Sequence, residues 1–300
     1  MTDRMMIKQW RKRNKRCRKS NKYFESFKSN TYKGFINRDF CNDEFLDLMH
    51  NPDRTFSEPA VSIIKDSHTT SSCVMPIKIG GRKVEVHIKR YNYQNIFYAL
   101  KNLFRTSRGK RVWKVANRLI SRNIPTPLPI SFLEQRKGRF LIKSFFITQK
   151  IDQSLPLHTL LQESFLNAKI ETIKNKNVLI QQTAHLVRAL HNRGVWHGDL
   201  KSANILVEKK EGQEDKLYLV DLDSTKIKTR LERKDKISDL ARLNVSLLNT
   251  RIVSTPDRLR FLKYYLNLSK KRDVRVKDYW KEAVLKTQKK LKKSGRKFIT

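Results

Sequence analysis

The chain has 300 residues, 38% of them hydrophobic and 31% charged, which suits one large globular domain or two lobes. Its formal net charge of +38 implies an anionic partner, namely nucleic acid, an anionic membrane face or an acidic substrate. No apolar run approaches the roughly 18 residues that a bilayer-spanning helix needs, and three widely spaced cysteines exclude a disulfide framework or a zinc knuckle, which fits a reducing cytosol.

Residues 1–57 are interpreted as a basic leader ahead of the folded lobes. The start of this segment is rich in Lys and Arg, with Met5, Met6, Ile7 and Trp10 interleaved. A basic segment with a few large apolar side chains can lie on an anionic bilayer surface. It can also remain a solvated tail, and the pattern leaves both interpretations open.

Residues 58–149 are expected to form a small β-rich lobe. Strands are predicted at 61–65, 73–79 and 83–90. Gly80-Gly81 between the last two strands predicts a tight hairpin turn. The polar loop 66–72 is the candidate phosphate cover, through its backbone N–H groups and the hydroxyls of Ser71 and Ser72.

A candidate nucleotide-binding lysine lies on the third of these strands. Val86-His87-Ile88-Lys89 matches the strand pattern Val-Ala-Ile-Lys at three of four positions. In that pattern the lysine points toward the nucleotide phosphates, so Lys89 is predicted to bind ATP. The alternative is an ordinary surface lysine followed by Arg90, and the motifs downstream favour the ATP role.

Residues 95–122 are predicted to be helical, because apolar side chains recur at helical spacing, and Gly109 can divide the segment. No Asp or Glu occurs between Lys89 and Glu134, so this helix offers no glutamate to the lysine. The Lys and Arg side chains of the helix can face a phosphorylated or carboxylated acceptor. They can also form a solvated face.

A proline-rich segment, 123–129, ends this helix. A hairpin is expected from strands at 130–133 and 140–148. The residues that follow take the place of a hinge between two lobes. Backbone groups of Gln149 and Ile151 are therefore the candidates for pairing with adenine.

Residues 150–300 are expected to form a mostly helical lobe that ends in a basic tail. Its central motif reads His-x-Asp-Leu-x-x-x-x-Asn, from His197 to Asn204, and leads into an apolar run. In phosphoryl transfer, a carboxylate such as Asp199 accepts the proton of the attacking hydroxyl, and an amide oxygen such as that of Asn204 holds a metal ion. The next apolar run ends at Asp221, where a kinase keeps its main magnesium ligand.

Each of these polar residues alone could belong to an ordinary turn, but two ordered motifs, each tied to a strand, favour chemistry over coincidence. His197 is interpreted as a brace for the loop, and Lys201 as a cation that screens the transferred phosphoryl group. Asp239 either accepts hydrogen bonds from the loop backbone or lies in the first turn of a helix. The basic C-terminal tail can hold an anionic membrane or remain solvated.

These residues together resemble the lipopolysaccharide core kinase family, the bacterial heptose and Kdo kinases. The resemblance covers about residues 58–250. It rests on Val86–Asn92, Phe104–Arg108, Ile124–Pro127, His197–Leu200 with Asn204, and Asp221–Asp223. The Lys-Arg-Tyr-Asn and Phe-Arg-x-Ser-Arg pieces are fairly specific to that family, whereas the Asp-Asn-Asp set is shared by related kinases.

The resemblance implies an α+β, bilobal protein-kinase-like fold. It also implies a cytoplasmic enzyme at the inner membrane face that uses ATP and Mg²⁺ and acts on a lipid-anchored sugar. Lys89 would contact the ATP phosphates, Asp199 would be the catalytic base, and Asn204 and Asp221 would hold magnesium. The chain departs from the family at Val112, where the helix glutamate is expected.

The leading hypothesis is therefore an ATP-dependent kinase that phosphorylates a heptose or Kdo hydroxyl of the lipopolysaccharide inner core. An atypical Ser/Thr protein kinase is the second, although no Ala-Pro-Glu follows Asp223 and the peptide-docking segment is absent. A catalytically weak, kinase-like binding protein is the third, which the missing helix glutamate favours. A nucleic-acid binder would need aromatic side chains within its basic patches, and the basic tails are almost free of them.

Overall fold

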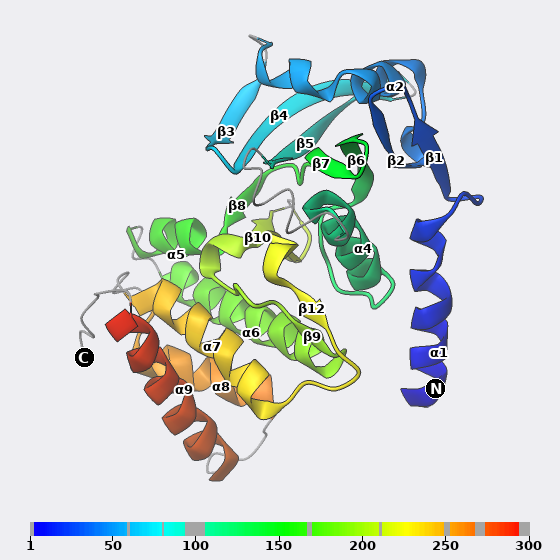
Figure 1. Ribbon diagram of the computed structural model, residues 1–300. Coiled ribbons are helices and arrows are strands. Elements are labelled where there is room, and N and C mark those ends of the chain that lie inside the picture. Colours follow the sequence, from blue (N-terminus) through cyan, green and yellow to red (C-terminus); the bar gives the residue numbers. More distant parts are fainter. Residues whose placement is uncertain are drawn as a thin grey trace. The chain divides into compact units, whose positions relative to one another are not determined.

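The computed structural model describes residues 3–58, 61–79, 81–93, 106–166, 170–209, 212–248, 253–267 and 274–293. The chain folds into two compact units, Met1–Ile151 and Asp152–Thr300. The first unit is built on a β-sheet and the second is mostly helical (Figure 1), so the expected α+β architecture is confirmed. Among the helices that the structure describes, none is both long enough and apolar enough to cross a bilayer.

An antiparallel sheet of seven strands forms the framework of the first unit. In space the strands follow the order β1-β2-β6-β7-β5-β4-β3 (Figure 1). The strands are β1 (Phe24–Lys28), β2 (Tyr32–Asn37), β3 (Ser62–Asp66), β4 (Thr70–Ile79), β5 (Arg82–Asn92), β6 (Pro129–Lys137) and β7 (Phe140–Gln149). Ile79 pairs with Arg82, and Gly81 in the turn has a φ of +78°, which suits glycine at the predicted hairpin. Gly80 lies outside the described residues.

Different elements cover the two faces of this sheet, because successive side chains of a strand point to opposite faces. One face holds the apolar core beneath α2 (Asp43–His50), where Ile88 and Phe145 pack with Phe45. The other face meets α4 (Arg108–Ile120), where the ring centroids of Trp113 and Phe132 are 5.6 Å apart. The small unit is therefore a three-layer structure with the sheet in the middle.

The N-terminal segment differs from the expected leader, because part of it belongs to the sheet. Its elements are α1 (Asp3–Asn14), η1 (Arg16–Arg18), β1, β2, η2 (Arg38–Phe40), α2 and η3 (Pro52–Phe56). Strand β2 pairs with β6 through residues 32–36. Gly34 permits this close pairing, since a Cβ atom there would collide with the carbonyl oxygen of Phe132. Residues 24–37 are thus an integral edge of the β-rich unit.

The helix predicted at 95–122 lies partly outside the described residues, which resume at 106. Helix α4 begins after Ser107, whose hydroxyl accepts a hydrogen bond of 3.1 Å from the Lys110 N–H and caps the helix. Gly109 lies inside α4 and does not break it. A Cβ atom at this position would lie 2.6 Å from the carbonyl oxygen of Phe145, so glycine lets the helix approach the sheet.

The second unit combines helices with short strands. Its helices are α5 (Leu157–Leu166), α6 (Ile170–Asn192), α7 (Arg233–Leu247), α8 (Thr255–Leu266) and α9 (Val274–Lys293), with 3-10 turns η4 (Ser202–Asn204) and η5 (Leu222–Ser224). Strands β8 (Ser154–Pro156), β10 (Ile205–Glu208) and β11 (Lys216–Leu219) form one small sheet, and β9 (Val195–Trp196) pairs with β12 (Lys226–Ile227). The loop between β9 and β10 carries the predicted catalytic motif.

Candidate active site

Helix α7 holds the catalytic loop through the buried carboxylate of Asp239. Its two oxygens accept hydrogen bonds from the backbone N–H groups of His197, at 2.8 Å, and Gly198, at 3.0 Å. Asp239 lies in the middle of α7, not in its first turn, and its side chain is fully buried. Of the two roles considered for Asp239, the structure therefore shows the hydrogen bonds to the loop backbone.

His197 is a buried side chain that joins the loop to the strand beyond it. Its Nε2 atom lies 3.1 Å from the carbonyl oxygen of Val220, so Nε2 carries the proton and donates. Burial lowers the pKa of His197, with nearby Asp239 opposing that effect. A neutral, buried imidazole of this kind suits the predicted bracing role better than that of a base.

The carboxylate of Asp199 is partly exposed and lies between two cations. Lys201 Nζ is 2.7 Å from Oδ2, and an Arg242 guanidinium nitrogen is 2.8 Å from Oδ1. Together the two cations fix the orientation of the proposed base. Arg242 was not singled out in the sequence, although it lies three residues after Asp239, and that spacing puts the two side chains on one side of a helix.

Asn204 and Asp221 lie at the same end of the β10–β11 ladder. Ile205 pairs with Leu219, and the Val220 N–H donates to the Asn204 carbonyl oxygen at 3.0 Å. The side-chain nitrogen of Asn204 donates to the Asp199 carbonyl oxygen at 2.8 Å, which turns the amide oxygen away from that contact. The structure therefore brings three of the predicted polar groups into one region of the second unit.

Two residues with positive φ lie where these segments meet, and one of them, Asp221, is strained. Asp221 has φ +56° and ψ +60°, a left-handed conformation that is uncommon for residues other than glycine and costs of order 1–3 kcal/mol. Gly198 has a φ of +79°, and a Cβ atom there would lie 2.8 Å from the Ser224 carbonyl oxygen. Strain of this kind is found preferentially at functional sites.

The oxygen donors of Asn204 and Asp221 fit a magnesium ion. Mg²⁺ prefers hard oxygen ligands, and it is usually held by one or two protein groups together with water and substrate phosphates. The hydrogen bond from the Asn204 amide nitrogen leaves its oxygen as the group that can coordinate. The pair thus has the chemistry that the sequence predicted for a nucleotide-bound metal.

Lys89 and the predicted phosphate cover belong to the first unit. Lys89 lies on β5 with its Nζ atom 5.5 Å from the centre of the Tyr91 ring. Ser72 is opposite Lys89 in the β4–β5 ladder, so the two residues share a face of the sheet. A phosphate contact from Ser72 is compatible with this placement.

Ser71 does not fit the predicted phosphate role. Strand β4 begins at Thr70, so the expected loop is shorter than predicted and Ser71 lies within a strand. Ser71 is opposite Arg90, on the other face of the sheet from Lys89. Its buried hydroxyl donates to Asp66 at 2.6 Å and accepts from Arg90 at 3.2 Å, so it is already used in the core.

The predicted hinge begins where β7 ends. The Gln149 N–H donates to the Leu128 carbonyl oxygen, and the Lys150 N–H to the Glu85 carbonyl oxygen, both at 2.9 Å. An adenine contact from Gln149 would therefore use another atom than its N–H. Gln149 and Ile151, like Lys89, lie in the first unit, whereas Asp199 and the predicted metal ligands lie in the second.

Val112, where the family's helix glutamate is expected, is a buried residue of α4. A buried carboxylate that does pair with this helix is that of Glu134 on β6. It lies 4.0 Å from Lys110 and 3.6 Å from Arg136. The described ion pairs therefore link this glutamate to α4 and β6.

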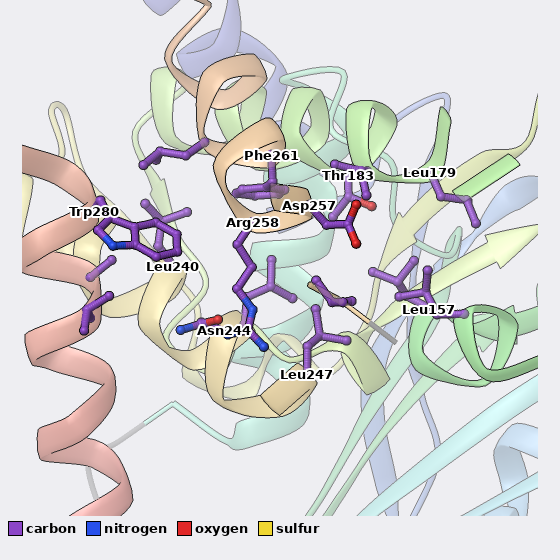
Figure 2. Close-up of a pocket in the computed structure, with 17 residues that line it drawn as sticks. Leu157, Leu179, Thr183, Leu240, Asn244, Leu247, Asp257, Arg258, Phe261 and Trp280 are labelled. Carbon is purple, nitrogen blue, oxygen red and sulfur yellow. The ribbon is translucent and has the colours of Figure 1, made fainter. Parts of the chain in front are cut away.

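An apolar cavity of about 100 Å³ lies between the helices of the second unit (Figure 2). Leu240, Leu243 and Leu247 of α7 line it together with Phe261 of α8 and Trp280 of α9. Asp257, which also lines the cavity, accepts a hydrogen bond from the Ser254 hydroxyl and forms ion pairs with Lys176 and Arg260. Helix α7 thus contributes one set of side chains to this cavity and another set to the catalytic loop.

A loop that carries one carboxylate, has its backbone held by a buried aspartate and lies beside a hairpin that ends in another carboxylate is typical of a protein-kinase-like fold. A solved structure described as "WaaP in complex with acyl carrier protein" has the same fold, with a TM-score of 0.59 and 19% sequence identity. The match covers 84% of this chain and 97% of that chain. The predicted fold is confirmed.

The model of the Lipopolysaccharide kinase (Kdo/WaaP) family matches residues 82–265, and the chain belongs to this family. It is 27% identical over 161 residues to lipopolysaccharide core heptose(I) kinase WaaP of Escherichia coli K12. The matched region covers 53% of this chain and 60% of that protein. The chain is 33% identical over 120 residues to 3-deoxy-D-manno-octulosonic acid kinase of Haemophilus influenzae 86-028NP, which covers 39% of this chain and 45% of that protein. The predicted family is therefore confirmed, and the chain spans about half of these relatives' lengths.

Proposed function

We propose that this protein is an ATP-dependent kinase that phosphorylates a sugar hydroxyl, of heptose or Kdo, in the lipopolysaccharide inner core. The observation that carries the proposal is the catalytic loop. Asp199 is oriented by Lys201 and Arg242, and the loop backbone is fixed by Asp239. Membership of a family of lipopolysaccharide kinases supports a sugar as the acceptor.

In the proposed reaction, Asp199 accepts the proton of the acceptor hydroxyl as its oxygen attacks the γ-phosphorus of ATP. The bond between the γ-phosphorus and the bridging oxygen breaks, and ADP leaves. Lys201, and Lys89 from the first unit, offset the negative charge of the transferred group. Asn204 and Asp221 would hold magnesium, which would neutralise further negative charge of the nucleotide.

The proposed acceptor is an anionic, lipid-linked oligosaccharide. A net charge of +38 supports an anionic partner, and the use of ATP supports a site of action on the cytoplasmic face of the inner membrane. We further propose that an anionic membrane surface attracts the basic terminal segments. Nucleic acid is not among the proposed partners.

The alternative of an atypical protein kinase would need a surface that docks a peptide. Eleven residues, 222–232, separate Asp221 from helix α7, which leaves little chain for the activation segment of such enzymes. A non-catalytic binding protein would not need the two cations beside Asp199. Both observations favour the sugar kinase.

The direct test is to incubate the purified chain with radiolabelled ATP, Mg²⁺ and inner-core oligosaccharide, and to locate the label. The sugar is expected to be labelled by the wild type. Asp199→Asn should lower turnover by about 10³-fold or more, because the base is lost, while ATP binding is retained. The matched variant Asp278→Asn, at an exposed position on α9, should keep full activity.

Label on protein and none on sugar would instead support the protein kinase. Absence of transfer by a folded wild type that binds ATP would support the binding protein. Full activity of Asp199→Asn would remove Asp199 from its proposed role.

A further inference from the structure

Two basic segments that are nearly 100 residues apart in the sequence meet in the first unit. One is the turn η1 with the end of α1, and the other is helix α4. The indole N–H of Trp113 donates to the Cys17 carbonyl oxygen at 3.0 Å, and the Ser121 hydroxyl donates to the Asn14 side-chain oxygen at 2.8 Å. Cys17 is buried between them. The turn is therefore fixed on the helix and does not behave as a free tail.

This contact concentrates positive charge. Its central cations are Arg18 from η1, Lys114 and Arg118 from α4, and Arg122 just after the end of α4, which we call the η1–α4 cluster. No Asp or Glu occurs in residues 4–24 or 86–133, the stretches that supply these elements. Among the ion pairs of the described residues, none joins a carboxylate to a member of the cluster. Within the described part of the chain, Lys114, Arg118 and Arg122 are therefore half-buried cations without a carboxylate ion-pair partner.

The cations of the cluster act unfavourably on one another. Burial, followed by the charges of Lys110 and Arg18, lowers the pKa of Lys114. Burial and Arg18 also lower the pKa of Arg118, and burial with Arg118 lowers that of Arg122 to about 10. A lowered pKa means that folding disfavours the charged form, so these charges destabilise the folded protein at neutral pH. A bound anion would relieve that repulsion.

Guanidinium groups and an ammonium group together match the chemistry of a phosphate ester. Arg presents paired N–H donors to phosphate oxygens, and Lys adds a point charge. One amphipathic ring lies next to a cation of the cluster, and another lies next to Arg16 of η1. The Arg122 guanidinium is 4.8 Å from the centre of the Trp10 ring, and the Arg16 guanidinium is 4.8 Å from that of Tyr23. Trp and Tyr are the aromatic residues enriched at membrane–water interfaces.

These observations favour a lipid headgroup over a nucleic acid. Nucleobase binding needs free aromatic faces on which bases stack, whereas the rings of Trp10 and Tyr23 already carry cations. We propose that the η1–α4 cluster is a binding site for the phosphate group of an anionic lipid headgroup, through Arg18, Lys114 and Arg118, with Arg122 beside them. The inference rests on the proposed anionic membrane partner, and it gives that partner a defined binding site on the protein.

The test measures binding of the full chain to vesicles without ATP, so that its failure leaves the kinase proposal standing. Vesicles contain phosphatidylcholine alone or with phosphatidic acid, whose phosphate is a monoester. The variant Arg18→Gln/Lys114→Gln/Arg118→Gln is compared with Arg82→Gln/Lys83→Gln/Arg139→Gln, which removes the same charges from exposed positions of the same unit. Circular dichroism and thermal unfolding verify that both variants are folded.

The wild type is expected to bind the phosphatidic acid vesicles. The cluster variant should bind about 100-fold more weakly, since each cation near the surface contributes about fivefold. The control variant should lose clearly less affinity for the phosphatidic acid vesicles. Equal losses in the two variants would show diffuse attraction of net charge and overturn the site. If the triple variant does not fold, Arg118→Gln alone should weaken binding about fivefold, and an unchanged affinity would overturn the proposal.

Inorganic pyrophosphate tests whether the cluster binds a soluble phosphate compound and not a lipid headgroup. It should raise the melting temperature of the wild type clearly more than that of the cluster variant, which keeps only the proposed nucleotide site, because a ligand that binds only the folded state stabilises it. Stabilisation by pyrophosphate together with vesicle binding supports the proposal. Stabilisation without vesicle binding would overturn the assignment to a lipid.

Discussion

The carboxylate of Asp239 is the residue on which the conformation of the catalytic loop most depends. It accepts the backbone N–H groups of His197 and Gly198, and it also lies 3.4 Å from His191. A buried N–H group left without an acceptor costs roughly 1–3 kcal/mol. Loss of this single side chain would therefore disturb the loop that carries Asp199.

His197 provides a prediction about pH. Burial lowers the pKa of His197 below its ordinary value of about 6.5. The neutral side chain therefore contributes stability that is fully present above about pH 6.5 and is lost as the pH falls through the lower, folded-state pKa. Urea unfolding at about pH 7.5 and about pH 5.5 should show a smaller loss of stability for His197→Gln than for the wild type.

The control for this measurement is His68→Gln, at an exposed position of the first unit. It should behave as the wild type at both pH values. An identical pH dependence in His197→Gln and the wild type would show that His197 is not the buried titrating group.

At the residue scale, sequence motifs singled out Asp199, Asn204 and Asp221, which the structure brings into one region of the second unit. They were accessible because they are close together in the sequence or tied to recognisable strands. Arg242 escaped prediction because it is 43 residues from its partner Asp199 and belongs to no motif. Ser71 was assigned wrongly as a phosphate contact, since the onset of β4 decides which face its hydroxyl takes. Contacts of this kind depend on tertiary packing, which local patterns do not encode.

Helix α7 is the element that organises the second unit. Asp239, Arg242 and Ser246 are spaced at helical intervals and all contact the catalytic loop, with the Ser246 hydroxyl accepting from the Ser202 N–H at 2.9 Å. Leu240 and Leu243 line the apolar cavity (Figure 2). The helix thus couples packing of the helical unit to the geometry of the loop.

Arg242 is predicted to act as a positioning residue on α7. Charge-assisted hydrogen bonds contribute about 1.5–3 kcal/mol, so Arg242→Gln should lower kcat roughly tenfold to a hundredfold. The KM for ATP should change little, because the residue contacts the base and not the nucleotide. Arg242→Lys should recover part of the activity, and Arg230→Gln, at an exposed site, should be normal. A purely structural role would instead lower the melting temperature and leave kcat unchanged in the folded fraction.

At the scale of elements, the hairpins and the predicted strands of the small lobe were accessible from alternation and turn residues. Strand β3 occupies Ser62–Asp66 where 61–65 was expected, and β7 extends the predicted 140–148 by one residue. Strands β1 and β2 were missed, because residues 24–37 show aromatic and polar side chains without a clear period. Their place beside β6 depends on Gly34, whose missing side chain matters only once the partner strand is present.

At the scale of the whole molecule, the net charge predicted an anionic partner but no location for it. The structure concentrates part of that charge where η1 meets α4, which the sequence could not show because the two elements are far apart in the chain. The residues predicted to bind the nucleotide are likewise far apart in the chain. Lys89 belongs to the unit Met1–Ile151, and Asp221 belongs to Asp152–Thr300.

The central claim is that Lys89 and Asp221 both serve the binding of Mg²⁺–ATP, and calorimetric titration of Mg²⁺–ATP into single variants measures this directly. Lys89→Met and Asp221→Asn should each weaken binding at least tenfold, and the effect of Asp221→Asn should disappear when Mg²⁺ is omitted. Lys83→Met, an exposed lysine on the same strand as Lys89, should bind as the wild type does. Unchanged affinity in either Lys89→Met or Asp221→Asn would contradict the proposed role of that residue in binding Mg²⁺–ATP.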